Sequence, residues 1–389
     1  MAVTTLAAVG DVLVDRARPE RALEGVAPVL EAADLVFGNF EGVLTDRHPP
    51  LPGMTASTVV ATVNAAPLSV FDVMSVANNH AMDAGRGGLD DTLATLRARG
   101  VEPVGAGASL AEALAPAVVR VGGIRVAVVA CTSVLPVNTQ AGPAAPGVAP
   151  LRAEDSYAAP LPGHVCPGLP AKVVSVLDEG DWAWVEKAVA RARARADLVV
   201  VSVHWGDHTR PWVLTDHERL CAELLAGAGA DLVLGHHQHL FKGARFVDGT
   251  PVFHGLGHIV FDMPRFPDDL RALGVDVDRA APHELAEVFG EYGFYPRPGS
   301  PDFPFHPSAR ITAVAIVVLD GGGIGRCGLV PCFIGVDGIA RPVRRGGARW
   351  EEVVARLTAC MSRAGLATAV LDRGETFGGA ALLAVEEGR

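Results

Sequence analysis

Two amides, an imidazole and a carboxylate lie close together in the stretch Asn78-Asn79-His80-Ala81-Met82-Asp83. This stretch follows the apolar run 70–76, which predicts a buried strand, and precedes Leu89, Leu93 and Leu96, whose spacing predicts one face of a helix. Open α/β sheets place their ligand sites at the carboxyl ends of strands. The stretch therefore predicts a site at a strand end, although an Asx-rich turn with a helix cap fits the same residues.

A second group of residues capable of chemistry follows other apolar runs. Eight of the thirteen histidines lie between positions 204 and 258, and most of them come just after an apolar strand. Asp11 and Glu41 occupy the same position after earlier strands. Imidazoles with a few carboxylates and no nearby cysteine suit Mn, Fe or Zn. We therefore expect two divalent metal ions, with Asp11, on a tight Gly-Asp turn, as the carboxylate that bridges them.

The elements that must position these residues alternate along the chain at the spacing of βα units. We expect strands at 6–9, 35–38, 70–76, 124–130, 198–203 and 232–234, and helices at 21–33, 182–195 (with Asp181 as N-cap), 215–228 and 350–364. The alternation predicts an α/β fold with a largely parallel sheet covered on both faces. Strands at 311–319 and 327–334 are expected to pair antiparallel.

Two segments rich in proline, residues 136–180 and 263–307, interrupt this pattern. Long irregular segments in compact domains are typically functional loops, so we expect both to shape the pocket, the first as a lid or rim. We expect residues 1–262 to form the catalytic domain, with 136–180 inserted in it. Residues 263–389 are expected to supply the second insertion and the C-terminal strands and helix that complete the same domain.

Composition restricts the partners and the location of the protein. The formal charge of −11, from 33 basic and 44 acidic residues, argues against nucleic acid or an anionic membrane as the main partner. The six cysteines include no CxxC pair, so neither a zinc ribbon nor a disulfide framework is indicated. The sequence shows no basic leader and no uninterrupted apolar stretch of about 18 residues, and we expect a cytoplasmic protein without a membrane partner.

The expected ligand is a small-molecule or peptide substrate, which can be anionic. Four arginines are available to meet an anionic group, although each also fits an ordinary surface position: Arg152, Arg210, Arg265 and Arg297.

Taken in order, the motifs resemble the CapA family, also called the poly-γ-glutamate synthesis protein family, a branch of the calcineurin-like metallophosphoesterases. The motifs that carry the resemblance are Gly10-Asp11, Asn39-Phe40-Glu41, Asn78-Asn79-His80, His204-Trp205-Gly206, Gly235-His236-His237-Gln238-His239 and Gly255-Leu256-Gly257. They lie between Leu6 and Asp262. The resemblance implies a four-layer αββα sandwich with the site at the strand ends, to which this chain adds two Pro-rich insertions and a small C-terminal strand–helix tail.

The resemblance also implies roles for individual residues. Asp11 is expected to be the bridging ligand, Glu41 a ligand of the first metal and Asn79 the amide ligand of the second. The histidines expected to bind metal are His204, His237 and His239, and His236 is an alternative for one of the last two. His80 is expected to protonate a leaving group or to stabilise the transition state. Asp83 is expected either to cap the next helix or to orient His80.

Three positions depart from the family pattern. His208 stands in place of a glutamate, Gln238 in place of a proline, and His258 in place of an asparagine. His208 and His258 are therefore candidates for direct substrate contact. Trp205 is either a third substrate contact or a core residue.

The first functional hypothesis is a metal-dependent hydrolase or transferase, with a dinuclear site, that acts on a phosphoryl or acyl centre. The second is an enzyme that forms or cleaves an amide bond, of the γ-glutamyl type, in a small peptide or amino acid. The third is a non-catalytic accessory protein of poly-γ-glutamate synthesis.

Overall fold

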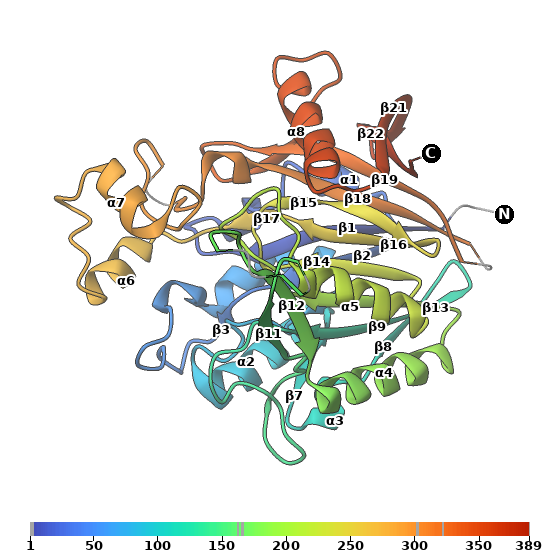
Figure 1. Cartoon of the computed structure of the whole chain (residues 1–389), viewed down its shortest axis with the longest axis horizontal. Coiled ribbons are helices and arrows are strands. Elements are labelled where there is room, and N and C mark those ends of the chain that lie inside the picture. Colours follow the sequence, from blue (N-terminus) through green and yellow to red (C-terminus); the bar gives the residue numbers. More distant parts are fainter. Residues whose placement is uncertain (1–3, 162, 165–166, 301–302, 321–322, 389) are drawn as a thin grey trace.

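Two β-sheets packed face to face form the centre of the molecule (Figure 1). The computed structural model describes residues 4–161, 163–164, 167–300, 303–320 and 323–388. The first sheet has the strand order β21-β22-β19-β18-β1-β2-β5-β6, with β17 beside β1 and β20 beside β19. The second has the order β15-β16-β14-β13-β9-β8. The single sheet inferred from the alternation of elements is therefore wrong, because that pattern does not reveal how strands divide between sheets.

The strands of the first sheet are β1 (Thr4–Leu13), β2 (Leu35–Phe40), β5 (Val73–Ser75), β6 (Glu102–Val104), β17 (His258–Phe261), β18 (Ile311–Asp320), β19 (Gly323–Ile334), β20 (Ala340–Pro342), β21 (Thr368–Phe377) and β22 (Ala380–Glu387). Those of the second are β8 (Ala117–Val121), β9 (Ile124–Thr132), β13 (Leu198–His204), β14 (Leu232–His236), β15 (Phe241–Val247) and β16 (Thr250–Leu256). Short pairs are β3 (Val43–Leu44) with β4 (Val59–Val60), and β7 (Ala106–Gly107) with β10 (Gly147–Val148).

The α-helices are α1 (Ala27–Glu31), α2 (Gly85–Ala98), α3 (Leu110–Ala113), α4 (Glu179–Arg193), α5 (Asp216–Gly227), α6 (Phe266–Ala272), α7 (Pro282–Phe289) and α8 (Trp350–Arg363). Short 3-10 helices lie at Pro19–Arg21, Ala56–Thr58, Thr62–Val70 and Pro307–Arg310. Among the described residues, none of these helices is long and apolar enough to cross a membrane.

The layering follows from the alternation of side chains along the strands. In β1, Leu6 and Ala8 pack in the core between the two sheets, whereas Ala7 and Val9 pack against the helical layer that includes α1 and α2. Helices α4 and α5 pack on the outer face of the second sheet. The chain is therefore a layered α/β sandwich, as the resemblance implied.

Strand direction brings many strand ends to one edge of the sandwich. β1, β2, β5 and β6 run parallel in the first sheet, and β9, β13, β14 and β16 run parallel in the second. β18 lies antiparallel to both β1 and β19, which confirms the predicted pairing of the two late strands. A side chain at Gly10 would place its Cβ 1.9 Å from the Gly257 carbonyl oxygen. Only glycine therefore allows this close approach beside Asp11.

Two predicted helix starts differ from the structure. The helix expected at 21–33 is reduced to α1, because Pro28 near its start has no N–H and favours a first-turn position. Helix α4 begins earlier than expected, with Asp178 as its N-cap, and the Asp178 side chain accepts a hydrogen bond from the Asp181 N–H. Asp181 itself lies inside the helix.

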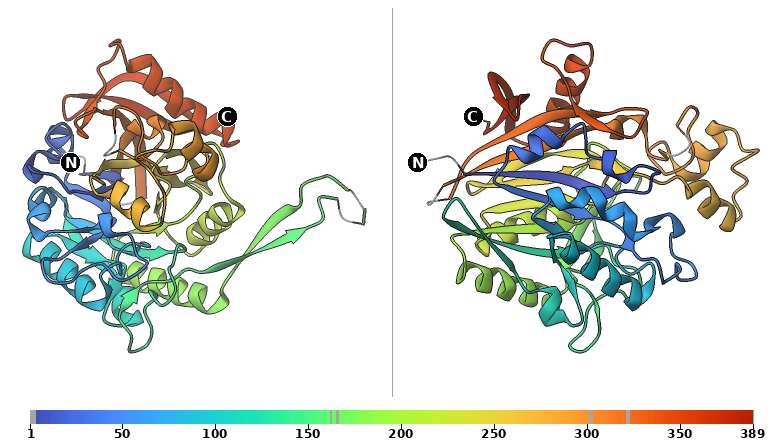
Figure 2. Two further views of the ribbon diagram at one scale, coloured as in Figure 1. Left: turned by 90° about the vertical axis from the view of Figure 1, so that its left-hand side faces the viewer. Right: turned by 180° about the vertical axis from the view of Figure 1, so that it is seen from behind.

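The two insertions have different structures. In residues 136–180, β11 (Ala153–Ala158) and β12 (Lys172–Leu177) pair as an antiparallel hairpin, here called the arm. The arm projects sideways from the body (left view of Figure 2), which differs from the lid or rim expected there. Residues 263–307 contain α6 and α7 and then pass over the strand ends with several aromatic side chains.

Candidate metal centre

Four chain segments bring metal-binding side chains to the same edge of the sandwich. Asp11 lies in β1, Glu41 follows β2, His204 ends β13, and His237 and His239 follow β14. These residues form two groups, Glu41–His204–His237 and Asp11–Glu41–His239. Within each group, one ligand atom from each residue lies within 4.8 Å of the others.

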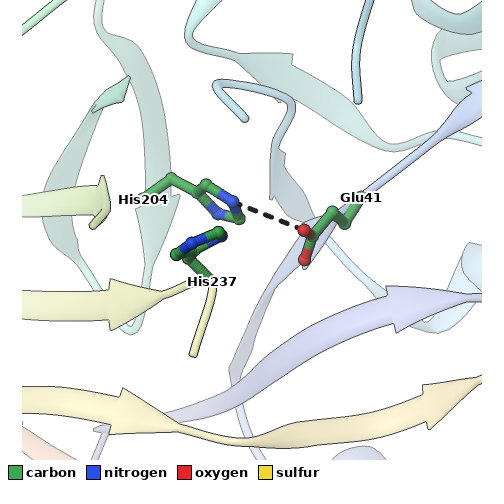
Figure 3. Close-up of side chains that lie close together, drawn as sticks. All are labelled: Glu41, His204 and His237. Atoms are coloured by element: carbon green, nitrogen blue, oxygen red, sulfur yellow. Dashed lines mark ion pairs between the residues drawn. The ribbon is translucent and has the colours of Figure 1, made fainter. Parts of the chain in front are cut away.

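In the first group, the imidazoles of His204 and His237 lie beside the Glu41 carboxylate (Figure 3). His204 Nε2 is 3.4 Å from Glu41 Oε1 and 2.7 Å from Asn79 Oδ1. The centroids of the two imidazole rings are 4.8 Å apart. The Asn79 amide oxygen therefore lies beside this group, and its role as a metal ligand stays a prediction.

The second group, Asp11–Glu41–His239, consists of buried residues only, whereas His237 of the first group is partly exposed. His239 Nδ1 is 3.1 Å from Asp11 Oδ2, and His239 Nε2 is 3.8 Å from Glu41 Oε1. His236 Nδ1 is 3.5 Å from Asp11 Oδ1, but His236 belongs to neither group. Glu41, rather than Asp11, is the carboxylate that both groups share. The bridging role expected of Asp11, and the choice between His236 and His237 as a ligand, stay predictions, because the donor groups alone do not fix the ligands and His236 also lies beside Asp11.

The loop after β14 is held in an uncommon backbone conformation. His237 and His239 have φ angles of 92° and 52°, in a backbone region that residues other than glycine seldom adopt. Between them, Gln238 turns away from the centre, and its amide donates hydrogen bonds to Glu218 Oε1 (3.0 Å) and to the His254 carbonyl (2.9 Å). Such strain persists only where the surroundings enforce it, and it is concentrated at functional sites.

The two carboxylates are both fully buried, and their pKa values shift in opposite directions. Burial raises the pKa of Asp11, but the adjacent imidazoles of His236 and His239 outweigh this effect and hold the pKa well below its ordinary value. Burial and then the neighbouring Asp11 raise the pKa of Glu41 well above its ordinary value. Burial lowers the pKa of His204 and of His237, so both imidazoles are neutral and able to bind a cation.

The side chains of the centre fit a divalent metal ion. Several buried atoms have no hydrogen-bond partner among the described residues: both carboxylate oxygens of Glu41, both ring nitrogens of His236, and His237 Nδ1. Burial of polar groups without partners is costly. A cation that binds the carboxylates and imidazoles removes much of this cost, and the oxygen and nitrogen donors suit the expected Mn, Fe or Zn.

His80 lies beside the centre, and Asp83 orients it. Asp83 Oδ2 lies 2.7 Å from His80 Nδ1 and 2.5 Å from the Thr58 hydroxyl oxygen. Because an ionised carboxylate only accepts hydrogen bonds, the Nδ1 atom carries the proton and Nε2 is left available. The N-cap of α2 is Ala84, without a side-chain cap. Of the two roles expected for Asp83, the capping role is therefore wrong and the orienting role fits.

The three expected substrate contacts lie in different surroundings. Trp205 is fully buried and donates its indole N–H to the His254 carbonyl (2.9 Å), so its role is core packing. His258 is also fully buried, with its ring 4.7 Å from Phe305, and it offers no surface to a substrate. His208 is partly exposed beside His237 and stacks on Phe294, with centroids 4.6 Å apart. Only His208 keeps a position from which it can meet a substrate.

The four arginines considered for anion binding are engaged within the chain. Arg152 pairs with Asp181, Arg210 with Asp207, and Arg265 with Asp15. The Arg297 guanidinium lies over the Tyr295 ring and donates to the Glu291 and Gly293 carbonyls. These contacts fit the ordinary surface position that was the alternative for each of the four arginines.

Two positions of the centre have roles that sequence reasoning missed. Asn39 is buried, and its amide donates to Asp11 Oδ1 (2.9 Å). The available signal was its place near the end of an apolar strand run, as for Asp11, and β1 and β2 pair with Asp11 opposite Asn39. Asn78 donates to the Phe40 carbonyl (2.7 Å) and accepts from the His80 N–H (3.1 Å), so it shapes the turn that presents Asn79 and His80.

Comparison with known proteins places this site in a family. The family model described as bacterial capsule synthesis protein PGA_cap matches residues 5–263. The PGA biosynthesis protein CapA of Bacillus subtilis is 31% identical over 249 residues, which cover 61% of this chain and 56% of that protein. The capsule biosynthesis protein CapA of Bacillus anthracis is 27% identical over 279 residues, which cover 66% of this chain and 60% of that protein.

A probable polyglutamine synthesis accessory protein of Mycobacterium tuberculosis is 30% identical over 273 residues, covering 66% of this chain and 65% of that protein. A solved structure of a hypothetical protein from Thermus thermophilus aligns with a TM-score of 0.42 at 17% identity, covering 83% of this chain and 97% of that chain. The chain thus spans a little over half the length of the Bacillus relatives. It belongs to the PGA_cap family of bacterial capsule synthesis proteins, which confirms the resemblance seen in the motifs.

Proposed function

We propose that this protein is a metal-dependent hydrolase or transferase that acts on a phosphoryl or acyl centre, with two divalent ions held by the two donor groups. One observation carries the proposal: the fully buried Glu41 carboxylate belongs to both groups, and neither of its oxygens has a hydrogen-bond partner among the described residues. A shared carboxylate with terminal nitrogen and oxygen ligands is the donor set of a two-metal site.

The residues have separate roles in the proposed reaction. Asp11, Glu41, Asn79, His204, His237 and His239 would hold the ions, which when bound supply Lewis acidity toward a phosphoryl or carbonyl oxygen. Asp83 accepts the hydrogen bond of His80 Nδ1–H and stabilises the imidazolium, whose Nε2–H gives its proton to the leaving group and leaves a neutral imidazole with its proton on Nδ1. Asn39 holds the Asp11 carboxylate in place.

The first experiment measures metal content and turnover together. After reconstitution with Mn²⁺, the full chain is expected to hold about two ions and to hydrolyse an aryl phosphate. Asp11→Ala is expected to lose both the metal and the activity. Elemental analysis that finds less than about one ion per chain at saturating Mn²⁺ would contradict the proposal.

A second candidate is favoured by the names of the relatives, which refer to PGA biosynthesis and to polyglutamine synthesis. In this alternative, the substrate is a γ-glutamyl amide, or the protein binds such a polymer without turnover. Parallel assays with an aryl phosphate and a γ-glutamyl anilide separate phosphoryl from amide chemistry. Binding of a γ-glutamyl oligomer without turnover of either compound would indicate the accessory role.

A further inference from the structure

The two donor groups of the centre differ in their exposure. We call Asp11, Glu41 and His239 the inner group, and Glu41, His204 and His237 the outer group. All three residues of the inner group are buried, whereas His237 of the outer group is partly exposed. Asn79 and His80 beside the outer group are also partly exposed. The centre is therefore more accessible from the side of His237, Asn79 and His80.

Aromatic rings enclose the inner group. The imidazole of His239 has its centroid 4.6 Å from that of Phe261, 4.9 Å from Phe305 and 5.6 Å from Phe294. We call these three rings the aromatic cage. Phe261 lies in β17, and the other two belong to the segment that passes over the strand ends after α7. The rings cover this side of His239 and restrict the position of its imidazole.

The groups also differ in charge. The inner group has two carboxylates and one imidazole, whereas the outer group has the shared carboxylate and two imidazoles, with the Asn79 amide oxygen beside it. Attraction between a cation and a carboxylate becomes stronger as the effective dielectric falls. The buried pair of carboxylates therefore favours retention of a cation, and the rings of the cage, packed on His239, hinder the movement by which this ligand would leave the cation.

We propose that the inner group retains its divalent ion, while the outer group exchanges its ion with solvent and is the position that meets the substrate. This inference rests on the proposed two-metal function. It adds that the two positions are not equivalent, and that the inequality comes partly from the aromatic cage. The substrate approaches from the side of His237, Asn79 and His80, where the centre is open.

Metal retention in the full chain tests this proposal without an activity assay. The wild-type protein is loaded with Mn²⁺ and then passed through a metal-free desalting column, and Mn is counted by elemental analysis and by electron paramagnetic resonance. We expect about two ions per chain before the column and about one after it. The matched variants are His237→Ala, which keeps the retained ion, and His239→Ala, which loses it.

A milder substitution tests the cage itself. Phe305→Leu keeps an apolar side chain but removes one ring, and we expect the retained ion to leave about tenfold faster. Val288→Ala, at an exposed position of the same insertion, is the control. Equal loss rates for the two ions of the wild-type protein, or equal losses in the two histidine variants, would overturn the inference and leave the two-metal function intact. A wild-type chain that binds no Mn²⁺ at saturation would overturn both.

Discussion

At the scale of single residues, the centre separates metal binding from proton transfer. The donors of the two groups are buried or face the shared Glu41 carboxylate, whereas His80 is held from behind by Asp83 and keeps 18% of its side chain exposed. His80 lies in neither donor group. A substitution at His80 should therefore change chemistry without changing metal content.

This separation gives a direct test by mutation. We expect His80→Ala to retain both ions and to lose about 10²–10⁴-fold in turnover, because a positioned general acid contributes a factor of this size. Asp83→Asn should lose about 10–100-fold, because the amide no longer fixes the proton on Nδ1. Steady-state kinetics and Mn content are measured on the same samples. His48→Ala is the control variant. Turnover in His80→Ala equal to that of the wild type would contradict the role of His80 as the general acid.

The sequence predicted most side chains of the centre, but not which of them lie next to one another. Asp11, Glu41 and Asn79 were predicted because each follows an apolar strand, and three histidines within four positions seldom serve packing alone. The sharing of Glu41 between two groups could not be predicted, because it depends on how the two sheets face each other. Phe294 and Phe305 were missed because a Pro-rich segment without periodicity does not show where its rings point.

At the scale of elements, the loop after β14 depends on a single amide. Gln238 stands between two residues of positive φ, and its side chain is anchored on Glu218 of α5 and on β16. A Cβ at Gly206 would lie 2.6 Å from Gln238 Nε2, and a Cβ at Gly255 would lie 2.5 Å from Gln238 Oε1. The two glycines make room for this anchor.

Loss of the anchor should weaken metal binding. Gln238→Ala removes both hydrogen bonds and leaves Glu218 Oε1 without this donor, so the strained loop can relax and move His237 and His239. We expect Mn²⁺ affinity to fall about 10–100-fold, measured by competition with a chelating dye. Gln140→Ala, in a different loop, is the control. Unchanged affinity in Gln238→Ala would show that the loop holds its shape without the anchor.

The sequence predicted the central elements better than the peripheral ones. The buried strands β9, β13 and β14 are continuous apolar runs, and the helices α5 and α8 show apolar residues at helical spacing, so both kinds were recognised. The edge strand β15 and the C-terminal hairpin of β21 and β22 were missed. The residues of β21 are mostly exposed or only partly buried, so pairing with β22 rather than an apolar pattern defines this strand.

At the scale of the whole molecule, buried imidazoles link stability to pH. Burial lowers the pKa of His254 well below its ordinary value, and lowers the pKa of His258 to about 3. Below about pH 6.5 the unfolded chain binds protons at these positions that the folded chain does not bind. The free energy of unfolding should therefore decrease as the pH falls from about 6.5, by about 1.4 kcal/mol per pH unit for each such histidine.

His254 allows this linkage to be measured, because its ring lies outside both donor groups and stacks on Trp205. His254→Phe keeps an aromatic ring of similar size and removes the titrating group. Urea denaturation of the metal-free wild type and variant at several pH values gives the free energy of unfolding as a function of pH. Between about pH 6 and pH 4.5, the slope of this free energy against pH should be smaller in the variant by the equivalent of one proton. A variant at the exposed His283 serves as the control. An unchanged slope in His254→Phe would show that this imidazole is protonated in the folded chain.

The arm of β11 and β12 leaves the body between two neighbouring strands of the second sheet, since β9 precedes it in the chain and β13 follows it. Strand β11 is exposed along most of its length, whereas β12 is tied to α5 by the Ser175 N–H, which donates to Asp216, and a two-stranded ribbon is only marginally stable where it leaves such support. Proteases should therefore reach the chain there first. The two pieces of a chain cut at the arm would remain joined through the pairing of β9 with β13, so Asp11 and Glu41 on one fragment would still meet His204 and His239 on the other.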